Sequence, residues 1–229
     1  MRILRKPGRN WLLLTAGVVL FGLIGMAPAA AKSLRLLPVD ETSSNPEFAA
    51  YHAALLAAVR RRDAAFVVAQ ADSEIKLSFG GDYGSESFHR ALTGTNEWQG
   101  EVYWRELQTV LELGGVFMGD GAFCTPYLSC IEVPGCPQCD PYETVFVTRK
   151  DAVARTEPNE QAPMAAQFSW DVLQIDNDAP GAQGWYAVKL PIGRTVFLSI
   201  KDSRMAIDYR ARFEKAAAGW RMTVFIAGD

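Results

Sequence analysis

Four cysteines carry the most distinctive chemistry in this sequence, and they fall within one short segment. Cys124, Cys130, Cys136 and Cys139 follow the spacing C-x5-C-x5-C-x2-C. Four thiolates can hold a structural zinc ion, and the C-x-x-C pair has the spacing of redox-active sites. A zinc ribbon needs two such knuckles, however, and nearby prolines oppose the helix that a redox motif would open. We therefore predict two structural disulfides, with Cys124–Cys139 enclosing Cys130–Cys136 as a working guess among three pairings.

Candidate acid–base residues are few. The two histidines, His52 and His89, lie in predicted helices without an H-E-x-x-H or H-x-H companion. The sequence has neither a G-x-S-x-G elbow nor a phosphate-binding P-loop. We therefore predict no catalytic site, no metal site and no cofactor. The alternative is a hydrolase or isomerase that uses a pocket in the helical half, with His52, Asp63, Asp82 or His89 as acid–base groups.

The first 31 residues have the pattern of a secretory signal peptide. Four basic residues precede the uncharged run Trp11–Met26, and the small residues 27–31 suit a signal peptidase. The run is shorter than the roughly 20 residues that span a bilayer, so retention as an anchor is only the alternative. We expect a periplasmic or secreted protein, a location that also favours disulfides.

The charge of the exported chain restricts its partners. Cleavage after residue 31 leaves 19 basic and 26 acidic residues, a formal charge of −7. An acidic protein is repelled by phosphate backbones and by anionic lipid surfaces. We therefore expect no nucleic-acid partner and, after signal removal, no membrane partner.

Apolar periodicity predicts helices across the N-terminal half. Asn45 caps a first helix that begins at Pro46, and Asp63 caps a second that continues to about Ser78 with Ile75 on its buried side. A short helix is expected over 86–92. Another is expected over 97–113, and its predicted core stripe is Trp104, Leu107, Val110 and Leu111.

From Glu143 onward the pattern changes to short strands separated by turns. We expect strands over 145–147, 168–175, 185–190 and 195–200, followed by a hairpin over 208–226. Aromatic residues are dense in this half, and most of them should fill the core.

Three segments of the β half follow one another in a recognisable order: Val153-Ala154-Arg155-Thr156-Glu157-Pro158, Gly184-Trp185-Tyr186-Ala187-Val188-Lys189-Leu190 and Gly193-Arg194-Thr195-Val196-Phe197-Leu198. With them, residues 145–205 resemble the bacterial type of Src-homology-3-like domain, although Val196 stands where that family has glycine. The resemblance implies a small barrel that binds peptidoglycan or a protein partner without catalysis. By family position, Arg155, Trp185 and Tyr186 are the first contacts to expect.

The flanks of that region suggest a second, weaker likeness. Arg62-Asp63, Ser78-Phe79-Gly80-Gly81 and Gly219-Trp220-Arg221-Met222 look like pieces of the nuclear-transport-factor-like cone. The likeness implies a helix-lined pocket on a curved sheet, into which the barrel would be inserted.

Together these features predict an α+β protein. After the signal peptide (1–31) come a mainly helical region (32–118), a cysteine-rich linking loop (119–142), a Src-homology-3-like barrel (143–206) and a C-terminal hairpin (207–229). The expected function is that of an exported, non-enzymatic binding protein of the cell envelope. Its partner is expected to be peptidoglycan or an envelope protein.

Overall fold

The computed structural model describes residues 34–96, 99–137, 139–191 and 193–228. The predicted signal peptide lies outside these residues. None of the described helices is long and apolar enough to cross a membrane.

The first and last predicted helices form where the sequence indicates. In α1 (Pro46–Arg60), the Asn45 side chain accepts hydrogen bonds from the N–H groups of Glu47 and Phe48, as an N-cap should. A short 3-10 helix, η1 (Thr42–Ser44), precedes it, and α3 (Ser85–Thr93) and α4 (Glu101–Glu112) follow. All four residues of the core stripe predicted for α4 are buried, which confirms that prediction.

The prediction of a long second helix is wrong. Asp63 does cap a helix by accepting from the Phe66 N–H, but this helix, α2 (Ala64–Ala69), ends after six residues. The chain continues as strand β1 (Ala71–Lys76), with Ile75 fully buried. A buried pair four residues apart fits either a helix or a strand face, and the hydrogen bonds to a distant strand decide for the strand.

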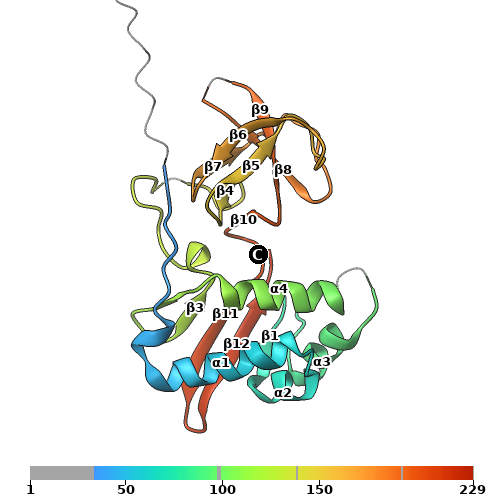
Figure 1. Cartoon of the computed structure of the whole chain (residues 1–229). Coiled ribbons are helices and arrows are strands. Elements are labelled where there is room, and N and C mark those ends of the chain that lie inside the picture. Colours follow the sequence, from blue (N-terminus) through green and yellow to red (C-terminus); the bar gives the residue numbers. More distant parts are fainter. Residues whose placement is uncertain (1–33, 97–98, 138, 192, 229) are drawn as a thin grey trace, which may run out of the picture. The chain divides into compact units, whose positions relative to one another are not determined.

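That distant strand belongs to a five-stranded sheet with the order β1-β12-β11-β3-β2. It joins β1 and the short strands β2 (Val116–Phe117) and β3 (Phe123–Thr125) to the C-terminal hairpin, β11 (Arg210–Ala216) and β12 (Gly219–Ile226). Only β1 and β12 pair in parallel; Figure 1 shows α1 and α4 crossing this sheet.

One aromatic core holds the helices and the hairpin together. The Phe48 ring of α1 lies 4.3 Å from Phe123 on β3, 5.6 Å from Phe213 on β11 and 4.8 Å from Trp220 on β12 (centroid distances). All four residues are at most 4% exposed. The N-terminal helices and the last hairpin therefore share one core, although residues 143–206 separate them in sequence.

The remaining strands make a second sheet, all antiparallel, with the order β10-β4-β7-β8-β9-β5-β6. Its members are β4 (Thr144–Val147), β5 (Ala152–Arg155), β6 (Met164–Phe168), β7 (Val172–Ile175), β8 (Trp185–Lys189), β9 (Thr195–Ser199) and β10 (Ser203–Met205). The strand expected over 168–175 is divided because Trp170 has a left-handed backbone, φ +58°.

The predicted α+β class is therefore confirmed. The closed barrel that the resemblance implies is not found, since no pairing among the described residues joins the edge strands β6 and β10. This sheet surrounds its own small core, which includes Val145, Val188 and Leu198.

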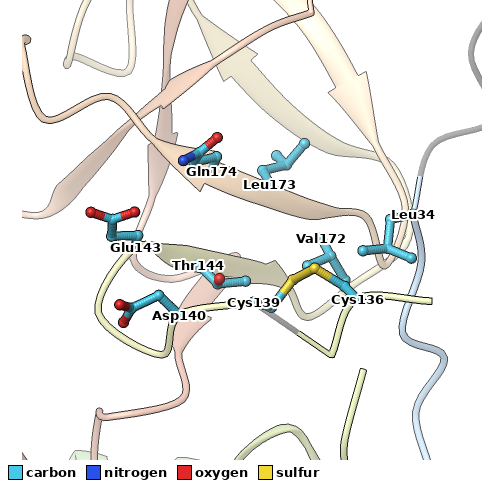
Figure 2. Close-up of a pocket in the computed structure, with 9 residues that line it drawn as sticks. All are labelled: Leu34, Cys136, Cys139, Asp140, Glu143, Thr144, Val172, Leu173 and Gln174. Atoms are coloured by element: carbon cyan, nitrogen blue, oxygen red, sulfur yellow. A yellow bond between two sulfur atoms is a disulfide. The ribbon is translucent and has the colours of Figure 1, made fainter. Parts of the chain in front are cut away.

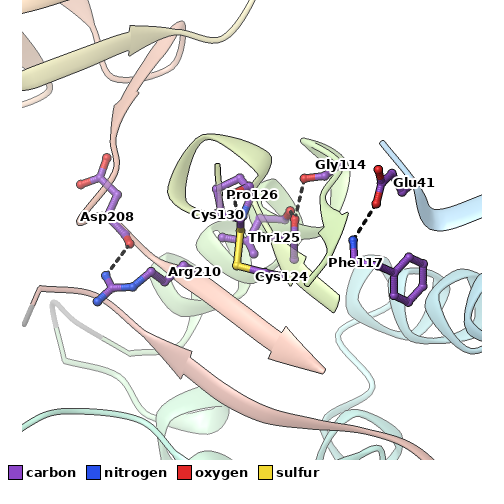
Figure 3. The surroundings of a disulfide bond; sticks show 10 residues. Glu41, Gly114, Phe117, Cys124, Thr125, Pro126, Cys130, Asp208 and Arg210 are labelled. Carbon is purple, nitrogen blue, oxygen red and sulfur yellow. Dashed lines mark hydrogen bonds between the residues drawn. A yellow bond between two sulfur atoms is a disulfide. The ribbon is translucent and has the colours of Figure 1, made fainter. Parts of the chain in front are cut away.

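All four cysteines form disulfides, but the guessed pairing is wrong. The bonds are Cys124–Cys130 and Cys136–Cys139. The 3-10 helix η2 (Tyr127–Ser129) turns the chain back after β3, which brings the Cα atoms of Cys124 and Cys130 to 5.9 Å (Figure 3). In the second pair, the Cys139 N–H donates to the Cys136 carbonyl in a tight turn, and the Cα atoms of the two cysteines are 5.3 Å apart.

The segment between the predicted signal peptide and α1, residues 34–45, is hydrogen-bonded to both sheets. The Val172 N–H donates to the Leu34 carbonyl, and the Leu36 N–H donates to the Trp170 carbonyl. Further along, the Glu41 carboxylate accepts a 2.7 Å hydrogen bond from the Phe117 N–H, as Figure 3 shows. The segment that directly follows the predicted signal peptide is thus part of the folded structure.

Candidate binding site

The register of the second sheet divides the predicted contact residues between its two faces. Trp185 pairs with Ser199, and Arg155 pairs with Phe197, which itself pairs with Ala187. Residues paired directly across an antiparallel ladder point to the same face, and alternate residues share a face. Trp185 and Arg155 therefore lie on one face, while Tyr186 lies on the other.

Tyr186 takes part in the core rather than in a surface. Its ring packs against the cluster around Val188, and its hydroxyl donates a 2.9 Å hydrogen bond to the Asp208 carboxylate. Burial, and then the charge of Asp208, raise the pKa of this hydroxyl far above its usual range. Asp208 also accepts from the Met205 N–H, so Tyr186 anchors the connection from β10 to the hairpin.

Trp185, by contrast, lines a cleft of about 620 Å³ between α4 and the β8–β9 strands, which we call the α4–β8 cleft. This volume is typical of sites for small ligands. Trp185 is half-buried, and the neighbouring Ile200 is 44% exposed. The lining residues are Arg105, Glu106, Thr109, Asn159, Glu160, Gly184, Trp185, Ser199, Ile200, Lys201 and Arg204.

Arg204 and Glu106 form a largely buried ion pair in the lining of the α4–β8 cleft. Arg204 is only 7% exposed, and its Nη1 donates to Glu106 Oε2 at 2.9 Å. Its Nη2 donates to the Tyr209 carbonyl at 3.4 Å, and its Nε has no hydrogen-bond partner in the described part of the chain. Glu106 is shared, because Arg105 Nη2 lies 3.3 Å from its other oxygen.

A second carboxylate is shared in the same way at the other side of the cleft. Glu160 lies 3.6 Å from Lys201 Nζ and 3.9 Å from Arg155 Nη2. Arg155 is held in place by a 2.7 Å hydrogen bond from its Nη1 to the Ala162 carbonyl. Arg155 therefore acts on the cleft through Glu160, and it is not itself a lining residue.

The acid–base candidates of the helical half do not come together. His52 Nε2 lies 3.2 Å from the Leu111 carbonyl, and burial lowers the pKa of the ring despite the opposing effects of that carbonyl and Asp40. Asp63 is used as a helix cap, and His89 is exposed. Asp82 lines a pocket of about 210 Å³ beside Tyr103, which neither histidine reaches. The described residues include no group of three or more His, Cys, Asp or Glu that could hold a metal ion.

A further pocket, of about 290 Å³, lies beside the Cys136–Cys139 disulfide (Figure 2). Apolar side chains of Leu34, Val172 and Leu173 line it together with acidic groups. Its lining includes no basic residue, and both of its sulfur atoms are held in a disulfide. This pocket therefore has fewer groups that can bind a ligand than the α4–β8 cleft has.

Comparison with known proteins adds no assignment: no family model matches the chain, and neither the curated proteins nor the solved structures contain a match.

Of the three contact residues predicted from the sequence, Trp185 alone is among the residues that line the α4–β8 cleft. Strict alternation along β8 indicates that Trp185 and Tyr186 face opposite ways, and this signal was available in the sequence. Nothing in the sequence indicated that Arg105 and Glu106 of α4 would meet Arg204, which lies almost 100 residues later. That contact depends on how two separate sheets are packed.

Proposed function

We propose that this protein is an exported, non-enzymatic binding protein that recognises a component of the bacterial cell wall through the α4–β8 cleft. The observation that carries the proposal is the position of Trp185 in the largest of the clefts described above, beside three basic side chains. An indole face gives a flat apolar surface for a sugar or an acyl chain, and the polar groups around it fix orientation.

The two disulfides support the proposed location outside the cytoplasm. Disulfides form and persist in oxidising compartments such as the periplasm and the extracellular space. Both bonds lie within residues 124–139, in the segment that joins the two sheets. The same location gives the protein access to the cell wall.

A binding role is also favoured over catalysis by the chemistry of the cleft. Its two carboxylates each form ion pairs with two cations, so neither is left free to serve as a general acid or base. The candidate groups in the helical half are dispersed. A cleft whose carboxylates are already paired orients a ligand better than it transfers protons.

The experiment is co-sedimentation of the oxidised protein, residues 32–229, with isolated cell-wall sacculi. We expect saturable pelleting that Trp185→Ala abolishes while its circular dichroism stays unchanged. Tyr83→Ala removes a 58% exposed aromatic ring outside the cleft and is the matched control. Absence of wild-type pelleting at high micromolar protein, or equal loss in both variants, would contradict the proposal.

A further inference from the structure

We infer that the wall ligand is recognised through a carboxylate, which binds between Arg105 and Lys201 in the α4–β8 cleft. This inference rests on the proposed function and specifies the chemical class of the ligand at the same site. Three lines of observation lead to it: the balance of charge in the cleft, the unused hydrogen-bonding capacity of its cations, and the buried arginine beneath them.

The cleft is basic although the chain is acidic. Three cations line it, Arg105, Lys201 and Arg204, against the two carboxylates Glu106 and Glu160. The exported chain as a whole carries a formal charge of −7. A local positive surplus in a partly desolvated cleft attracts an anionic group, because the lower dielectric strengthens the Coulomb interaction.

The ion pairs of the cleft follow two short rows that each end in an exposed cation. One row runs from buried Arg204 through Glu106 to Arg105, and the other runs from Arg155 through Glu160 to Lys201. A single anion placed between the two end cations would join the rows into one alternating series of charges.

Both end cations have donors left for such an anion. The Arg105 side chain is 59% exposed, and its contacts with Glu106 are 3.3 and 3.4 Å long. The Lys201 side chain is 79% exposed, and its Nζ is 3.6 Å from Glu160, which is beyond hydrogen-bond range. A guanidinium fork matches the two oxygens of a planar carboxylate, so a carboxylate is the anion we assign.

Buried Arg204 keeps one of these end cations, Arg105, in place. An arginine that is 7% exposed, with its Nε unpartnered among the described residues, has a high desolvation cost. It fixes Glu106, and Glu106 in turn orients Arg105 toward the cleft. With Trp185 on the adjacent wall, the cleft fits a wall fragment that carries a carboxylate beside a sugar ring or aliphatic chain.

The test compares three preparations of sacculi: untreated, with carboxyl groups converted to neutral methylamides, and treated with hydrofluoric acid to remove phosphodiester-linked polymers. We expect amidation to weaken binding at least about tenfold, which is what losing one charge-assisted pair costs, and acid treatment to leave it unchanged. Loss only after acid treatment would assign the anion as phosphate and overturn the carboxylate.

Charge-reversal variants complete the experiment. Arg105→Glu and Lys201→Glu should each weaken binding to untreated sacculi by at least about tenfold. Arg149→Glu is the matched control, because Arg149 is a 61% exposed ion-paired arginine outside the cleft, and it should bind as the wild type does. If the wild type binds amidated and untreated sacculi equally, the carboxylate is wrong and wall binding stands; if it binds neither, the proposed function itself fails.

Discussion

Arg204 and Glu106 connect strand β10 to helix α4 through two side chains that are only 8% and 17% exposed. Breaking a buried ion pair leaves the remaining charge without compensation, which costs more than the pair itself contributes. We predict that Glu106→Gln lowers the free energy of unfolding by about 3 kcal/mol, as measured by urea denaturation. The double variant Glu106→Gln/Arg204→Met should lose less than this, and a loss under about 1 kcal/mol in the single variant would contradict the prediction.

Buried His52 should make the protein less stable as the pH falls. Burial lowers its pKa below the ordinary value near 6.5, so as the pH falls the unfolded chain takes up the proton first. The stability that neutral His52 provides is therefore complete above about pH 6.5 and is lost as the pH falls through the folded-state pKa.

Urea midpoints at pH 7 and pH 5 measure this effect. The wild type should lose more stability over that interval than His52→Gln, whose amide can still donate to the Leu111 carbonyl without titrating. Identical losses in the two proteins would show that His52 is not responsible.

What could be predicted at individual residues depended on whether their partners were local. Asn45 and Asp63 cap helices within three residues of themselves, and both were found from sequence. The family resemblance predicts the same role for Trp185 and Tyr186, whereas alternation along a strand gives them opposite faces. Arg204 has neighbours from α4 that no local pattern encodes.

Among the elements, β1 shows why a local pattern can mislead. Its buried positions, Ala71 and Ile75, have a spacing that a helix also allows. The strand is selected because β12, about 150 residues later, pairs with it in parallel through Ala71 and Met222. Helices α1, α3 and α4 were predictable because their hydrogen bonds are internal and their apolar stripes are clear.

The two disulfides close short loops, and their expected contributions to stability are therefore modest. Chain entropy gives about 2 kcal/mol for loops of this size. Cys136→Ser/Cys139→Ser should lose about that much, and Cys124→Ser/Cys130→Ser somewhat more, because Cys124 lies on β3, which pairs with both β11 and β2 in the sheet of the aromatic core. Guanidinium denaturation of the oxidised variants measures both losses.

Peptide mapping of the non-reduced protein provides the connectivity control. It should find Cys124 linked to Cys130 and Cys136 linked to Cys139. A bond between Cys124 and Cys139 would contradict the described fold of this segment.

At the scale of the whole molecule, residues 143–229 cannot form a self-contained unit. That fragment contains β11 and β12 without β1, β3 and α1, so Phe213, Trp220 and Phe225, which are at most 4% exposed in the full chain, would lose their cover. We predict that limited proteolysis digests residues 207–228 rapidly in this fragment and slowly in the full chain. Equal protection in both would show that the hairpin does not need the N-terminal core.

A photo-crosslink between the α4–β8 cleft and the wall is the most direct test of wall recognition through this cleft. Ile200→p-benzoylphenylalanine places the reactive group among the cleft-lining residues, and Met164→p-benzoylphenylalanine places it at a 65% exposed site on β6 outside the cleft. After irradiation with sacculi, we expect the variant at position 200 to remain on the sacculi through detergent washing and the variant at position 164 to remain only at background levels. Equal retention of the two variants, or none for either, would contradict recognition of the wall through the α4–β8 cleft.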